Sequence, residues 1–190
     1  AGEVQIPQLR GGDVVTVALG TGGVLPVAQL TQLKGFSVDA MPVEFPSLVQ
    51  VGTANITVSG GGTASAPKLV SHIHPTGCVG TIWSATGNGS RLDLSPLVDL
   101  TGATCGALTV RATAGATVDL GGLLTLSEGV LGFLSEGTNS LIYLPKLQEA
   151  AKATRPVSFE ARNSGVLAMP VFQGGPAVSV TIRSGGTLDA

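Results

Sequence analysis

Hydrophobic and polar positions along this 190-residue chain repeat in a six-residue phrase that occurs nine times. The phrase reads apolar, any residue, apolar, small or proline, any residue, apolar, and its second position is often polar. Apolar residues at positions one and three alternate with a period of two, which is typical of a strand with one buried face. Successive copies are 18 to 28 residues apart, which indicates one coil of a solenoid per copy. The copies start at Val4, Leu25, Val43, Ala64, Leu92, Val118, Ile142, Leu167 and Leu188, and the ninth is incomplete.

Turn signals and further strand signals surround each copy. Glycine or asparagine precedes most copies, and these residues accept the positive φ that a tight corner requires. Proline often takes the fourth position; because it has no N–H to donate, it suits a strand end. Each coil is therefore expected to contain two or three short strands. The additional β-branched or apolar runs are residues 14–17, 56–58, 81–83, 108–110, 157–159 and 178–182 upstream of the phrase, and 97–100 and 123–126 after it.

These patterns predict an all-β fold, a right-handed parallel β-helix of about nine coils, forming one repeat domain over residues 1–190. Coils stacked at a spacing of about 4.8 Å would give a rod roughly 40 Å long. Residues 147–153 are the one segment that favours a helix, expected as a local bulge. Because the chain opens and stops inside a coil, we expect a segment of a longer protein or a unit that stacks end to end.

Composition excludes several classes of protein. Charged residues make up only 12% and hydrophobic residues 43% of the chain, which is not the composition of a disordered protein. No apolar run reaches about 18 residues, so no membrane span is expected. Lysine and arginine are scattered singly, so no nucleic-acid partner is expected. The glycines fall at coil corners, which explains them without a phosphate-binding loop, and we expect no cofactor.

Units of the form Gly-x-apolar-x-apolar-x-x-Leu, such as Gly115 to Leu123 and Gly165 to Phe172, carry a family resemblance. The chain resembles the parallel β-helix repeats of extracellular microbial surface proteins, including adhesins and autotransporter passenger domains. The resemblance covers essentially the whole chain. A competing resemblance is to the leucine-rich repeats of bacterial surface proteins, which would place a helix or a regular convex turn in each coil. The return segments, such as residues 108–113, favour strands instead.

The resemblance implies an exported, non-catalytic structural or adhesive module at a cell surface or in an extracellular filament. Its partners would be flanking coils, further copies of the chain, or a surface glycan or protein. A carbohydrate-active β-helix enzyme, either a polysaccharide lyase or a glycoside hydrolase, is the main alternative. An ice-binding solenoid is a lesser one.

Cys78 and Cys105 occupy nearly the same place in consecutive coils, 14 residues after Ala64 and 13 after Leu92. Neighbouring strands are about 4.8 Å apart, which lies within the Cα separation that a disulfide requires, roughly 4.4 to 6.8 Å. A disulfide would fit an oxidising compartment. The alternative is a pair of reduced, buried cysteines acting as small apolar residues.

His72 and His74 lie on one face of a strand, since they are two residues apart. Together with the two cysteines they form a weak candidate zinc site. The spacing lacks the compact pairs of known zinc motifs. Ordinary surface histidines are the alternative interpretation, and it is the one we favour.

Asp93 and Asp119 take the same phrase position in adjacent coils, so both are expected to face outward about 5 Å apart. Arg91 lies on the same face as Asp93. Paired carboxylates at such a separation suit retaining glycoside hydrolysis, and an enzyme would use Asp93, Asp119 and Asp99 in a groove with a basic partner such as Arg91. The alternative interpretation, which we favour, is a solvated charged edge with no catalytic residues.

Ice binding would require a flat column of threonine at one repeated position. The position before the phrase is occupied by a mixed set instead, so the column is interrupted. Its occupants are Thr63, Arg91, Thr117, Leu141, Val166 and Thr187.

Overall fold

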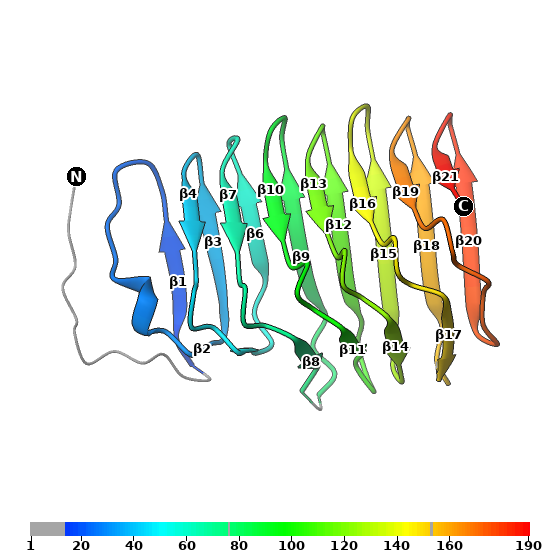
Figure 1. The fold of residues 1–190 in the computed structure, drawn as a ribbon, viewed down its shortest axis with the longest axis horizontal. Helices are drawn as coiled ribbons and strands as arrows, with labels where there is room; N and C mark the ends of the chain where they lie inside the picture. Colours follow the sequence, from blue (N-terminus) through cyan, green and yellow to red (C-terminus); the bar gives the residue numbers. More distant parts are fainter. Residues whose placement is uncertain (1–13, 76, 153) are drawn as a thin grey trace.

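A computed structural model describes residues 14–190, except residues 76 and 153. The chain winds into a parallel β-solenoid whose coils follow one another along the long axis (Figure 1). Two long sheets form its main walls, and every pairing between the named strands is parallel. The first wall is an eight-stranded sheet of β1 (Thr16–Leu19), β3 (Gly35–Asp39), β6 (Ile56–Ser59), β9 (Thr81–Thr86), β12 (Leu108–Thr113), β15 (Leu131–Glu136), β18 (Val157–Arg162) and β20 (Val178–Arg183).

The second wall is a seven-stranded sheet, and it is built from the phrase. Its strands are β4 (Pro42–Glu44), β7 (Thr63–Ser65), β10 (Arg91–Asp93), β13 (Thr117–Asp119), β16 (Leu141–Tyr143), β19 (Val166–Ala168) and β21 (Thr187–Asp189). Shorter strands form the third side of the coils. They are β8 (Ser71–Ile73), β11 (Asp99–Thr101), β14 (Thr125–Ser127) and β17 (Glu149–Lys152) in a four-stranded sheet, and β2 (Gln32–Leu33) and β5 (Gln50–Val51) in a pair.

The register of the seven-stranded sheet follows the phrase position by position. Leu92 pairs with Ala64 on one side and with Val118 on the other, and Ile142 continues the same row. Leu92, Val118 and Ile142 are fully buried, so the first position of the phrase points into the core. The sequence prediction of an all-β parallel solenoid is therefore confirmed.

Close contact between coils depends on glycine at one corner. Gly129 has a φ of 93°, a conformation that residues with a side chain rarely adopt. A Cβ atom there would collide with the backbone of Gly102 in the preceding coil. The two glycines thus let the loops before β12 and β15 stack directly on each other.

The predicted number of coils was too high. About six turns are present in the described part of the chain, not nine. The first copy of the phrase lies outside the described residues. The second does not form a strand, because Pro26 leads into a short 3-10 helix, η1 (Val27–Gln29). The last copy forms β21, which pairs with β19.

The helix expected over residues 147–153 is also wrong. Residues 149–152 form β17, which pairs with β14 through a register shift between Thr125 and Ser127. Leu147 and Ala150 are fully buried. Helix propensity amounts to only tenths of a kcal/mol per residue, and stacking on the preceding coil outweighs it here. Residue 153 is outside the described part.

No helix in the described part of the chain is long and apolar enough to cross a membrane.

Candidate functional site

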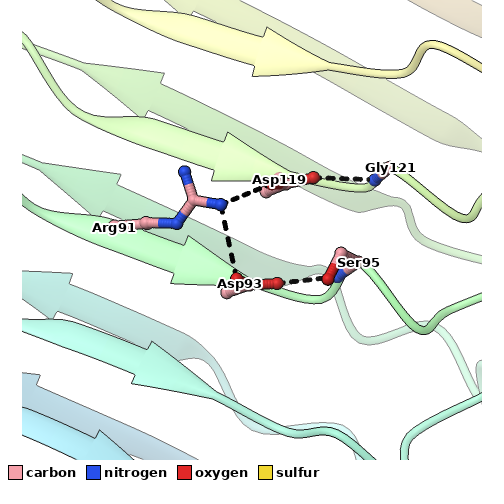
Figure 2. A network of polar contacts seen from close by, with 5 residues as sticks. All are labelled: Arg91, Asp93, Ser95, Asp119 and Gly121. Atoms are coloured by element: carbon pink, nitrogen blue, oxygen red, sulfur yellow. Dashed lines mark hydrogen bonds and ion pairs between the residues drawn. The ribbon is translucent and has the colours of Figure 1, made fainter.

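Three charged residues meet on the outward face of the seven-stranded sheet. Asp93 of β10 and Asp119 of β13 are register partners, and Arg91 lies two residues before Asp93 on the same face (Figure 2). Leu92 and Val118 alternate with them and point into the core. The period of two therefore brings the three side chains together, as the alignment of the phrase predicts.

Every oxygen of the two carboxylates accepts a hydrogen bond. Arg91 Nη2 donates to Asp93 Oδ2 at 3.3 Å and to Asp119 Oδ2 at 2.5 Å. The backbone N–H of Ser95 donates to Asp93 Oδ1 at 3.0 Å, and that of Gly121 donates to Asp119 Oδ1 at 2.8 Å. Both backbone contacts are Asx turns, in which an aspartate bonds the N–H two residues on. We call this set of residues the Arg91 clamp.

The electrostatics of the Arg91 clamp favour the ionised form of Asp93. Partial burial by itself raises the pKa of Asp93, but the hydrogen bonds from Ser95 and the charge of Arg91 outweigh it, so the pKa lies below its ordinary value. The Asp119 side chain is only 13% exposed and faces the same guanidinium. A general acid for glycoside hydrolysis requires a raised pKa instead. The geometry thus suits turn formation and charge pairing between coils.

Among the described residues, the positions directly beside the Arg91 clamp in this column hold no third acid. Ser65 precedes Asp93 in the same column, and Tyr143 and Ala168 follow Asp119. Asp99 lies on β11, which belongs to the four-stranded sheet, so the structure places it on a different wall from the clamp.

Cys78 and Cys105 form a disulfide with a Cα–Cα separation of 4.4 Å. Both residues are exposed, in the loops that precede β9 and β12. The bond therefore joins the loops of consecutive coils at the surface, and the cysteines are not part of the core.

The two histidines are buried, so the expectation of surface histidines is wrong. His72 is the register partner of Leu100, and Leu100 pairs in turn with Leu126. His72 thus fills a place in the core that leucine takes in the next two coils. Its ring packs on Trp83 with centroids 4.7 Å apart. The spacing of Leu69 and His72, which matches Leu97 and Leu100, is the sequence signal that could have revealed this position.

The environments of the two rings differ. Burial, with a smaller contribution from the charge of His74, lowers the pKa of His72 to about 4, and His72 Nε2 has no hydrogen-bond partner. His74 Nδ1 contacts the carbonyl oxygen of Pro75 at 3.0 Å, and His74 Nε2 contacts Thr81 Oγ1 at 2.9 Å. No group of three or more metal-ligating side chains occurs among the described residues. The cysteines of the predicted zinc set are oxidised to a disulfide and supply no thiolate.

A second charged network, on the eight-stranded sheet, was missed at the sequence level. Arg162 of β18 donates to Glu136 of β15 at 2.8 Å and contacts Glu160 at 3.5 Å, and Asn163 Nδ2 also donates to Glu136. The hydrogen bond from Arg162 is the main cause that lowers the pKa of Glu136. These residues fall outside the phrase, so aligning the phrase does not bring them together.

Comparison with protein-family models, with curated proteins and with solved structures gives no significant match to this chain. The case for a function therefore rests on the residues and geometry of the chain itself.

Proposed function

We propose that this chain is a non-catalytic structural or adhesive β-solenoid module, exported to a cell surface or an extracellular filament. The Arg91 clamp is the observation that carries the proposal. Its carboxylates are the paired acids that a carbohydrate-active enzyme would use, and all four of their oxygens are engaged in holding two turns and one arginine.

The distribution of repeated and variable positions supports the same role. Inward columns repeat leucine, valine and isoleucine from coil to coil. Residues in the outward columns change from coil to coil. One such column holds Thr63, Arg91 and Thr117 in three successive coils. Variable outward positions on a constant core suit a surface that recognises a partner or spaces other domains. The same column continues with Leu141, Val166 and Thr187. A charged residue and two large apolar residues therefore interrupt its threonines, whereas ice binding requires an unbroken threonine column.

The exposed disulfide supports export. Structural disulfides persist in oxidising compartments and are rare in reducing ones. Cys78 and Cys105 are both at the surface, where a reducing environment would reach them. An extracellular location is therefore part of the proposal.

A depolymerisation assay separates this proposal from the carbohydrate-active alternative. The purified chain is incubated with a panel of acidic and neutral polysaccharides, and new reducing ends and unsaturated products are measured. We expect no product above the level of a boiled control, because neither carboxylate is arranged to transfer a proton. Product formation that disappears in the Asp93→Asn variant, with the fold kept, would establish an enzyme and overturn the proposal.

A further inference from the structure

We propose that the outward face of the eight-stranded sheet binds a sugar that carries a carboxylate group, in a shallow hollow over Gly132. The proposal rests on the non-catalytic surface role argued above and names the ligand class for it. The hollow has a volume of about 200 Å³, enough for about one sugar ring, and its walls come from β12, β15 and β18. It lies on a different wall of the solenoid from the Arg91 clamp.

The floor of the hollow exists because residue 132 has no side chain. Gly132 lies in register between Thr109 of β12 and Ser158 of β18. A Cβ atom at Gly132 would stand 3.5 Å from both hydroxyl oxygens. The two hydroxyls therefore flank a gap one side chain wide, and each can both donate and accept a hydrogen bond.

Arg111 supplies a positive charge that the protein leaves unpaired. It lies on the same face as Thr109, in a row that continues with Leu134 and Glu160. Its Nε atom is buried without a hydrogen-bond partner. No ion pair joins Arg111 to another residue in the described part of the chain. Arg91 and Arg162, in contrast, each form two ion pairs with carboxylates.

The nearby acids do not satisfy Arg111. Both carboxylate oxygens of Glu136 are taken, one by Arg162 and one by Asn163, and Arg111 contributes only a longer-range charge there. A ligand carboxylate would pair with the terminal amino groups of Arg111, because the planar guanidinium matches a carboxylate with two parallel hydrogen bonds.

The rest of the hollow favours a sugar acid over an acidic peptide. Glu160 is held by Arg162 at 3.5 Å and faces the hollow as a hydrogen-bond acceptor. Acceptors of this kind suit the several hydroxyl groups that each ring of a sugar carries. Val130 and Leu134 add apolar surface for the face of a ring. One carboxylate and several hydroxyls are thus the chemistry that the hollow can take.

A binding titration tests the site. The intact chain is titrated with a galacturonic acid trisaccharide and with the matching neutral galactose trisaccharide, using calorimetry and two-dimensional NMR. We expect the acidic sugar to bind more tightly, with amide shifts centred on β12, β15 and β18. Arg111→Ala is expected to weaken binding about tenfold or more, since a hydrogen bond to a charged group contributes about 1.5 to 3 kcal/mol and about 1.4 kcal/mol is a factor of ten.

Two further variants make the result specific. Gly132→Val fills the floor and is expected to weaken binding without unfolding the chain, because valine favours strands and the site has ordinary contact distances. Arg183→Ala removes an equal charge from β20 of the same sheet and is expected to leave binding unchanged.

Several outcomes would overturn the site. These are the absence of binding, equal affinity for the neutral trisaccharide, insensitivity to Arg111→Ala, and equally tight binding of an acidic peptide. None of them touches the proposed non-catalytic role, which would fail instead if the trisaccharide were cleaved.

Discussion

Replacing Phe133 by alanine is expected to lower the free energy of unfolding by about 3 to 5 kcal/mol, the usual cost of removing a buried aromatic ring. Phe133 is 1% exposed, and its ring stacks on that of Phe159 in the next coil, with centroids 4.8 Å apart and planes 11° from parallel. Each coil of a solenoid contacts only its neighbours, so the cavity cannot be filled from elsewhere in the chain.

Urea unfolding followed by circular dichroism measures this effect. Phe133→Leu is the matched control, and it is expected to cost roughly 1 kcal/mol because most of the volume is kept. A loss below about 1 kcal/mol for Phe133→Ala would mean that the two rings do not stack in the core.

The second large effect is a loss of stability in acid that depends on His72. The pKa of His72 lies at about 4 in the folded chain and at 6.5 when the ring is solvated. Above pH 6.5 the ring is neutral in both states, and stability is fully present. As the pH falls from 6.5 towards 4, the unfolded chain takes up a proton that the folded chain excludes, so stability is lost. The full difference corresponds to roughly 3 kcal/mol.

His72→Leu provides the comparison, because leucine occupies the same core column at Leu100 and Leu126. The free energy of unfolding is measured in urea at intervals between pH 4 and pH 7. The wild-type curve is expected to fall more steeply than the variant curve between pH 6.5 and pH 4. Parallel curves over that range would show that His72 is not held neutral in the core. His74, whose ring centroid lies 6.0 Å away, and Trp83 pack on His72, and both are present in the wild-type chain and in the variant.

Much of the fold could be predicted from sequence, because the repeating positions are those that stacking constrains most. A one-residue slip of β10 would turn Leu92 outward and Asp93 inward, so the alternation fixes the register. The failures lie where a local signal competes with stacking. The 147–153 segment favours a helix by propensity, yet residues 149–152 form β17, and Leu147 and Ala150 are buried in the core.

The candidate site could be predicted only in part. Alignment placed Asp93 beside Asp119, with Arg91 on the same face, because those positions belong to the phrase. The two Asx turns were not predicted, although both have the same spacing in the sequence, Asp93-Leu94-Ser95 and Asp119-Leu120-Gly121. Alignment of the phrase could not reveal the hollow over Gly132. The hollow depends on outward positions of three coils that lie outside the phrase, including a residue without a side chain, Gly132, and an arginine without an ion pair, Arg111.

If the acidic pair belongs to the scaffold, Asp93 stays ionised, and a carboxyl-carbon NMR titration of Asp93 is the sharpest test of this role. The protein is labelled with carbon-13 at aspartate carboxyls, and the Asp93 signal is assigned by its absence in Asp93→Asn. We expect the pKa of Asp93 to lie below its ordinary value of 3.8, because Ser95 and Arg91 stabilise the ionised form. A pKa above that value, in the range of about 5 to 7 where a general acid operates, would show that Asp93 is a catalytic acid and not part of the scaffold.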